Sequence, residues 1–224
     1  MINNIIFDIG NVILNFKLHE VLSEFTLKIE EQQFIIDNII NSPEWFGNSL
    51  IDTGYITKEE AISIVQDRTN HINDELISNF WNNYNKYSKV DFKVIDLIKI
   101  LKDKGYKIYL LSNINEHTYN NVKESGIFDM VDGYVLSYLE HQVKPYNSIY
   151  NTLLNRYNLK ANECLFIDDN QNNIDTAIRL GFNALKVEPD NYNDLHSKIS
   201  KYIEKKFWIM KMMIKKFCFS LMII

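Results

Sequence analysis

Short runs of β-branched and other apolar residues recur along the chain and have the length of strands. The five runs are NIIFDI (4–9), KIYLLSN (107–113), GYVLSY (133–138), CLFIDD (164–169) and NALKVE (183–188). They are almost continuously hydrophobic and lack the alternation of a half-exposed strand, which is typical of strands buried on both faces. The pattern therefore predicts a central parallel sheet.

Helical patterns separate these strand-like runs. They cover residues 90–105, 116–126, 147–158 and 171–181, and three of them end in a glycine, at Gly105, Gly126 and Gly181. Glycine is the usual residue just beyond a helix C-terminus. Strands that alternate with helices predict an α/β fold, a doubly wound parallel sheet with helices on both faces. We expect residues 1–15 and 90–200 to form this catalytic core.

Residues 16–89 interrupt the alternation of strands and helices. Two long blocks in this segment, 19–46 and 57–87, have helical patterns, and Thr57 with Glu60 forms a predicted capping box at the start of the second block. An all-helical insertion between the first strand and the rest of a sheet is typical of a lid. We therefore predict a small helical cap over residues 16–89.

The last residues, 201–224, form an apolar and basic extension of unknown role. Lys211, Lys215 and Lys216 interrupt its apolar run, so it falls short of the roughly 20 continuous apolar residues that span a bilayer. The lysines also spread around more than half of a helical wheel, which is not the divided surface of an interfacial helix. We predict an extension outside the catalytic core, with no clear membrane association.

Composition narrows the class of protein. The chain has 224 residues, 46% of them hydrophobic, and a net charge of -5, so it gives no electrostatic reason to expect a nucleic acid partner. Two cysteines and five scattered histidines show neither a disulfide framework nor zinc-ligand spacing. We expect no secretory signal and a cytoplasmic location. The sequence leaves the oligomeric state open.

Polar residues with catalytic potential follow successive predicted strands. They are Asp8, then Ser112 and Asn113, then Lys144, then Asp168 and Asp169. Ligands of open parallel sheets bind beyond the carboxyl ends of the strands, where the strand order reverses, so we expect these side chains to share one crevice. Clustered carboxylates repel one another unless a cation neutralises them. Oxygen ligands favour Mg²⁺, and the lysine and hydroxyl suit a phosphoryl group.

Four motifs of this chain resemble those of the haloacid dehalogenase superfamily. FDIGNV, LLSN, KP and FIDDNQNN occur in the order and spacing of that family, over about residues 4–190. The cap segment DTGYITKEEA is also similar to a stretch found in the family. The resemblance is to subfamily IA, which has a small helical cap, and within it to the bacterial sugar phosphatases that include glucose-1-phosphate phosphatases.

The resemblance implies a role for each motif residue. Asp8 is expected to be the nucleophile that forms an aspartyl-phosphate, which water then hydrolyses. Ser112 and Asn113 would donate hydrogen bonds to the phosphoryl oxygens, and Lys144 would offset their charge. Asp8, the Gly10 carbonyl and Asp169 would bind Mg²⁺. Asp168 would hold a metal-bound water or position the lysine.

The resemblance therefore predicts a Mg²⁺-dependent phosphatase that acts on a small phosphorylated metabolite, with a sugar phosphate favoured. Fold alone would not license this activity, so the prediction depends on the site residues.

Gly10 departs from the common form of the first motif. In D-x-D motifs the second aspartate is the general acid and base, a contribution of about 10² to 10⁴ in rate. Its absence favours substrates with a stabilised leaving oxygen, such as anomeric sugar phosphates. Two alternatives stay open: a metal-independent 2-haloacid dehalogenase-like hydrolase, which also lacks this aspartate, and a catalytically inactive phosphate-binding module.

Overall fold

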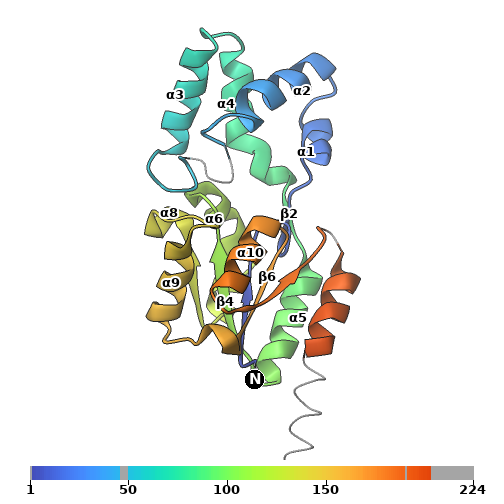
Figure 1. The fold of residues 1–224 in the computed structure, drawn as a ribbon. Coiled ribbons are helices and arrows are strands. Elements are labelled where there is room, and N and C mark those ends of the chain that lie inside the picture. Colours follow the sequence, from blue (N-terminus) through green and yellow to red (C-terminus); the bar gives the residue numbers. More distant parts are fainter. Residues whose placement is uncertain (1, 46–49, 190, 203–224) are drawn as a thin grey trace, which may run out of the picture.

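A five-stranded parallel sheet forms the centre of the protein (Figure 1). The computed structural model describes residues 2–45, 50–189 and 191–202. The strand order is β5-β4-β1-β6-β7. The strands are β1 (Asn4–Phe7), β4 (Lys107–Ser112), β5 (Gly133–Leu136), β6 (Cys164–Asp168) and β7 (Asn183–Lys186). Each of the five predicted runs contains one of these strands.

Helices cover both faces of this sheet (Figure 1). Because successive side chains point to opposite faces of a strand, Ile5 and Phe7 pack in one core while Ile6 packs in the other. The first core includes residues of α5 (Phe92–Asp103) and α6 (Glu116–Lys123), and the second includes residues of α9 (Asn147–Arg156) and α10 (Gln171–Arg179). Two short helices, α7 (Ile127–Met130) and α8 (Ser137–Glu140), and a 3-10 turn, η3 (Ala161–Glu163), also belong to this part of the chain, and residues 192–202 are helical as well. The predicted doubly wound α/β fold is confirmed.

Glycines end three helical segments as predicted. Gly105, Gly126 and Gly181 all have positive φ, at 84°, 74° and 89°. This left-handed conformation is one that residues with a Cβ adopt at a cost, so these positions fix where the helical segments stop.

The segment from residue 16 to residue 88 is largely helical where the structure describes it. It contains α1 (Leu18–Phe25), α2 (Ile29–Ile35), the π-helical turn η1 (Ile36–Ile40), α3 (Lys58–Arg68), α4 (Asp74–Asn83) and the 3-10 turn η2 (Tyr84–Tyr87). A separate apolar core, which includes Trp45, Phe80 and Trp81, packs these elements together. The helices lie beyond the carboxyl edge of the sheet (Figure 1), which supports the interpretation of the segment as a cap.

Each predicted cap block contains a break that the hydrophobic pattern does not show. The first block is interrupted between α1 and α2, where Thr26 and Lys28 are extended. The second is interrupted between α3 and α4, where Asn70, His71 and Asn73 have positive φ. Asparagine tolerates this conformation better than most residues. The capping box of Thr57 and Glu60 at the start of α3 is present as predicted.

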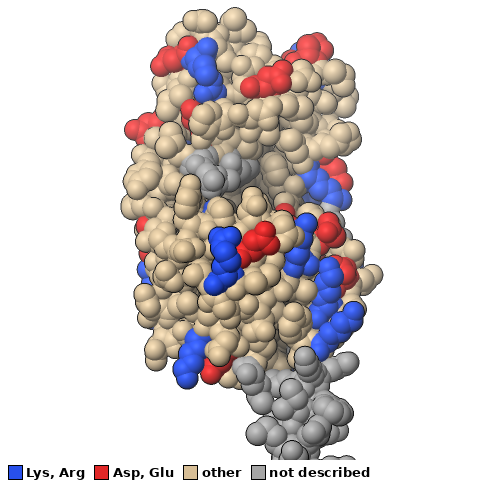
Figure 2. Space-filling view, in the orientation of Figure 1, with Lys and Arg blue, Asp and Glu red and all other residues tan. Residues whose placement is uncertain are grey.

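Two very short strands connect the cap to the sheet. β2 (Leu14–Asn15) pairs antiparallel with β3 (Lys89–Val90), so the chain enters and leaves the cap at the same place. A recess lies between the cap and the sheet domain, and acidic and basic side chains are interspersed over the face in view (Figure 2).

None of the helices in the described ranges is long and apolar enough to cross a bilayer. Most of the predicted C-terminal extension, from residue 203 onward, lies outside the described residues.

Candidate active site

The carboxyl ends of the neighbouring strands β1 and β6 bring the predicted acidic residues together. Asp8 directly follows β1, and Asp168 is the last residue of β6. The chain runs from β1 to one side of the sheet and returns to β6 on the other side, so β1 lies at the point where the strand order reverses. This is where open α/β sheets bind ligands. Carboxylate oxygens of Asp8, Asp168 and Asp169 all lie within 4.8 Å of one another.

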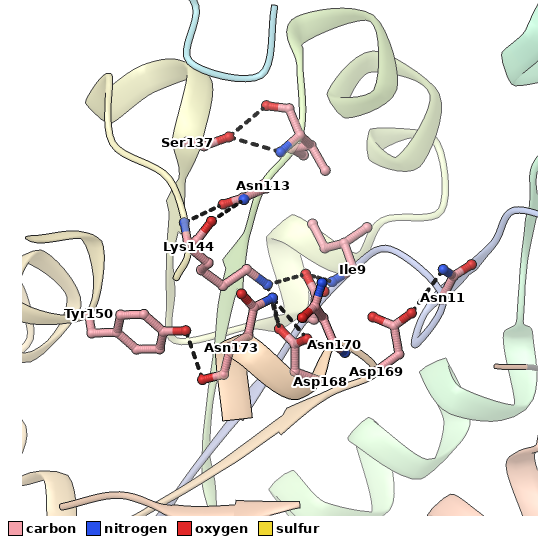
Figure 3. Close-up of polar contacts among 12 residues, drawn as sticks. Ile9, Asn11, Asn113, Ser137, Lys144, Tyr150, Asp168, Asp169, Asn170 and Asn173 are labelled. Atoms are coloured by element: carbon pink, nitrogen blue, oxygen red, sulfur yellow. Dashed lines mark hydrogen bonds and ion pairs between the residues drawn. The ribbon is translucent and has the colours of Figure 1, made fainter. Parts of the chain in front are cut away.

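Lys144 inserts its ammonium group between two of these carboxylates. Its Nζ lies 2.8 Å from Oδ1 of Asp8 and 2.6 Å from Oδ2 of Asp168. The residue is only 2% exposed, which is rare for lysine unless the charge is paired. Figure 3 shows the side chain reaching from its loop toward Asp168. The predicted lysine therefore belongs to the acidic cluster.

Burial and mutual charge shift the pKa values in this cluster. Burial raises the pKa of Asp8 to about 7, while Lys144 opposes the rise and the neighbouring carboxylates add to it. Burial also raises the pKa of Asp169, against a hydrogen bond from Asn11. For Lys144, burial favours the neutral amine, but the charges of Asp168 and Asp8 outweigh it and raise the pKa. The raised pKa of Lys144 favours its charged form, whereas burial favours the neutral form of Asp8 and Asp169.

Hydrogen bonds fix Asp168 more tightly than the other two carboxylates. Its Oδ1 accepts from the Asn170 backbone N–H at 2.8 Å, and the Asn173 amide donates to both oxygens at 3.0 and 3.1 Å. Together with Lys144, these donors surround the group, which is fully buried. Asp168 is therefore well placed to position the lysine.

Asp169 and Asp8 keep more of their oxygen atoms directed to the cavity. Asp169 accepts one hydrogen bond through Oδ2, from Asn11 Nδ2 at 3.0 Å (Figure 3). Asp8 accepts the Ile9 backbone N–H at 2.7 Å on Oδ1, the oxygen that also contacts Lys144. Both residues line the cavity beside Gly10.

Asn113 anchors the loop that carries Lys144. Its side-chain Oδ1 accepts from the Lys144 backbone N–H at 2.8 Å, and its Nδ2 donates to the Lys144 carbonyl at 2.9 Å (Figure 3). The side-chain amide thus holds the Lys144 loop, and the expectation that the backbone or amide of Asn113 donates to a phosphoryl group stays a prediction. Asn113 also lines the cavity.

Ser112 ends β4 and is fully buried. Among the described residues its Oγ has no hydrogen-bond partner. A buried hydroxyl without a partner is uncommon, but Ser112 is not one of the described residues that line the cavity beside Asn113. Ser137 holds the next turn of chain in place, because its Oγ accepts from the Ile114 N–H and donates to the Ile114 carbonyl.

A cavity of about 310 Å³ opens above the acidic cluster. This volume is at the lower end for small-molecule sites. Its base is formed by Asp8, Gly10, Asn11, Asn113, Lys144, Asp169, Asn170 and Asn173. Its remaining walls are Leu14, Phe16, Asp52, Asn85, Ser88, Ile114 and Thr118. The cap and the segments next to it thus contribute to the same cavity as the strand ends.

The donor set fits a hard divalent cation. The three clustered groups are oxygen ligands, the type that Mg²⁺ prefers. Three carboxyl groups face the single positive charge of Lys144, and burial, with the neighbouring carboxylates adding to it, raises the pKa of Asp8 and of Asp169. Asp8 and Asp169, which face the cavity, are the residues that would hold the ion.

Sequence patterns missed several residues that support the site. Asn11, Asn173 and Ser137 each make hydrogen bonds to the motif residues or to the loop beside them. Two of them lie within the quoted motifs, but asparagine is common throughout this chain, so an individual asparagine carried little signal. Ser137 lies near the end of the strand-like run 133–138, but no motif distinguished it.

Comparison with known proteins establishes the family. Residues 2–181 match the haloacid dehalogenase-like hydrolase family, and the chain belongs to it. The chain is 24% identical over 209 residues to a D-ribitol-5-phosphate phosphatase of Bacteroides thetaiotaomicron, covering 89% of this chain and 98% of the relative. It is 25% identical over 181 residues to a sesquiterpene phosphatase of Aspergillus oryzae, covering 80% and 87%.

Solved structures share the fold. A haloacid dehalogenase family enzyme of Bacteroides thetaiotaomicron, in complex with magnesium and inorganic phosphate, superposes with a TM-score of 0.68 at 23% identity, covering 85% of this chain and 96% of that one. A dehalogenase superposes with a TM-score of 0.60 at 17% identity, covering 86% and 90%. At these identities the likeness defines the fold alone.

Proposed function

We propose that the protein is a Mg²⁺-dependent phosphatase that hydrolyses a small phosphomonoester, with a sugar phosphate as substrate. The observation that carries the proposal is the convergence of Asp8, Asp168 and Asp169 with the buried ammonium of Lys144 at the base of one cavity. Two relatives with phosphatase names, aligned over most of the chain, support the same class of reaction.

Asp8 is the proposed nucleophile. A carboxylate oxygen attacks phosphorus, the bond to the leaving oxygen breaks, and an aspartyl-phosphate forms, which water then hydrolyses. Lys144 contacts Oδ1 of Asp8, so it holds the nucleophile in one orientation and offsets the charge of the incoming phosphoryl group. Ser112, whose buried hydroxyl has no described partner, would donate to a phosphoryl oxygen.

The metal ligands proposed are Asp8, Asp169 and the carbonyl of Gly10. When bound, Mg²⁺ would neutralise part of the phosphoryl charge and orient the group for in-line attack. Asp168, saturated by Lys144 and by the two asparagine donors, positions the lysine. Asn113 positions the lysine from the other side, through the backbone.

Gly10 shapes the proposed specificity. Without a carboxylate at this position, no side chain of the motif protonates the leaving oxygen. The rate of hydrolysis falls least for anomeric phosphates, because their leaving oxygen is already stabilised. It falls most for simple alkyl phosphates. We therefore expect glucose 1-phosphate to be turned over faster than glucose 6-phosphate, and a clear preference for the 6-phosphate would count against this part of the proposal.

Metal dependence separates the phosphatase from a dehalogenase. Phosphate release from a panel of sugar phosphates is measured with Mg²⁺ and with excess EDTA, for the wild type and for Asp8→Asn. The proposal predicts release only by the wild type with Mg²⁺. Halide release from 2-haloacids in EDTA would favour the dehalogenase instead, and no release of either product by a folded protein would favour a binding module.

A further inference from the structure

Two buried polar side chains on the cavity wall have no partner of their own. Asn85, in η2, is 6% exposed, and Ser88, just before β3, is 9% exposed. Neither amide atom of Asn85 and no hydrogen-bonding atom of the Ser88 side chain has a partner among the described residues. Burial raises the pKa of the Tyr84 hydroxyl, and the nearby Asn85 amide opposes that rise by less than Thr118 and Asn115 do. Both residues line the cavity above Asp8.

The backbone around these side chains is already fixed. The Asn85 carbonyl accepts from the Ser88 N–H at 3.2 Å and from the Asn121 amide of α6, also at 3.2 Å. The segment is therefore tied to the sheet domain while its two polar side chains stay unpartnered. Buried polar groups without partners are costly and uncommon in native proteins, and a ligand in the cavity would satisfy both.

The charges of the cavity restrict that ligand. Among the described lining residues Lys144 is the only cation, and it is paired with Asp8 and Asp168. Away from the acidic cluster, the wall carries the fully buried carboxylate of Asp52, which accepts from Asn115 at 3.1 Å. A second anionic group on the substrate would meet a carboxylate there and no described cation, which is unfavourable in a buried site.

We propose that Asn85 and Ser88 recognise hydroxyl groups of the substrate's organic part, and that this part is a neutral polyol or sugar. The amide and the hydroxyl each offer a donor and an acceptor, and Asp52 offers an acceptor. This inference rests on the proposed function, because it assigns the leaving-group end of the same cavity. It adds that phosphoesters whose organic part carries a carboxylate, such as phosphorylated carboxylic acids, are poor substrates.

The first test compares a hydroxylated substrate with one that has no hydroxyl group outside the phosphate. We expect Asn85→Ala and Ser88→Ala to lower the ratio of kcat/KM for ribitol 5-phosphate to that for phenyl phosphate, by roughly 2- to 12-fold for each hydrogen bond lost. Ser88→Thr, which keeps the hydroxyl, should retain the ratio. Asn155→Ala, at an exposed asparagine of α9, is the matched control. An unchanged ratio in folded Asn85→Ala and Ser88→Ala would overturn the inference.

The second test addresses charge. Glycerol 3-phosphate and 3-phosphoglycerate differ in a hydroxymethyl group against a carboxylate. We expect the wild type to prefer glycerol 3-phosphate, and Asp52→Asn to reduce that preference. Equal turnover of the two compounds by the wild type would overturn the assignment of a neutral substrate.

A binding measurement separates this inference from the proposed function. Calorimetry on the Asp8→Asn background compares ribitol 5-phosphate with inorganic phosphate. If Asn85→Ala weakens binding of the polyol ester more than binding of inorganic phosphate, the inference holds even when the wild type releases no phosphate, and only the proposed activity fails. Equal effects on both ligands contradict the inference, whatever the activity.

Discussion

The side-chain amide of Asn113 holds the backbone of Lys144 through two hydrogen bonds, of 2.8 and 2.9 Å. This contact joins the end of β4 to the loop that supplies the buried ammonium. The position of the charge between Asp8 and Asp168 therefore depends on a residue that contributes no charge of its own.

Asn113→Ala should lower activity more than stability. Loss of two hydrogen bonds costs about 1 to 3 kcal/mol in unfolding free energy, and misplacement of a catalytic group by about 1 Å can cost roughly 10²-fold in rate. Asn183→Ala is the matched control, because the amide of Asn183 in β7 also bonds to two backbone groups, the carbonyls of Asn162 in η3 and of Cys164 at the start of β6. The control should lose stability and keep its kcat. A similar kcat in both variants would argue against the positioning role.

Gly10→Asp should restore a general acid. A Cβ built at Gly10 meets nothing within 4 Å, and the backbone there is outside the left-handed region, so a residue with a Cβ is accommodated without backbone strain. Because general acid–base catalysis contributes about 10² to 10⁴, we expect kcat for glucose 6-phosphate to rise relative to glucose 1-phosphate. Gly10→Asn has the same shape but no proton to donate, and it should not change the ratio. An equal change in both variants would contradict the explanation.

Lys144→Met should destabilise the protein as well as inactivate it. Removing one partner of a buried ion pair costs about 3 to 5 kcal/mol, because the carboxylates of Asp8 and Asp168 then lack their cation. Adding Asp168→Asn to this variant should recover part of the stability without restoring activity. Chemical denaturation and phosphate release measure the two effects. If Lys144→Met alone were as stable as the wild type, the ion pairs would contribute little to the stability of the fold.

Asp132 provides a test of electrostatics away from the site. Burial tends to raise its pKa, but the Ile108 N–H, Lys107 and Lys102 outweigh burial and lower it. The folded pKa is therefore below the unfolded value of about 3.9, so the stabilisation is complete above that pH and is lost as the pH falls through the folded pKa. Asp132→Asn should be less stable than the wild type at pH 7, and the difference should shrink below about pH 4. A difference that does not change with pH would contradict this assignment.

The sequence was most informative where local patterns determine structure. The five strands and the glycine-terminated helices follow from continuous hydrophobicity and from backbone freedom at Gly105, Gly126 and Gly181. The strand-end residues could be grouped because parallel strands bring their carboxyl ends to one edge. The clustering of Asp8 and Asp169 with Lys144 is the result of that rule.

The remaining features depend on tertiary packing. The orientation of the cap determines that Asn85 and Ser88 line the cavity, and no periodicity in the sequence encodes that orientation. The sequence likewise does not reveal the contacts of His141 with residues 53 and 55. Its Nδ1 donates to the Thr53 carbonyl at 2.8 Å, and its ring stacks on Tyr55. The use of the Asn113 amide to hold the Lys144 loop is a long-range contact that its position in a motif did not reveal.

Detection of a covalent phosphoryl group on Asp8 is the most direct test of the proposed mechanism. The protein is mixed with a turned-over sugar phosphate and Mg²⁺, quenched in acid during turnover, and digested for mass spectrometry. The account predicts one added phosphoryl group on the peptide that contains Asp8, and none in EDTA. Mg²⁺-dependent phosphate release by Asp8→Asn at the rate of the wild type would contradict it.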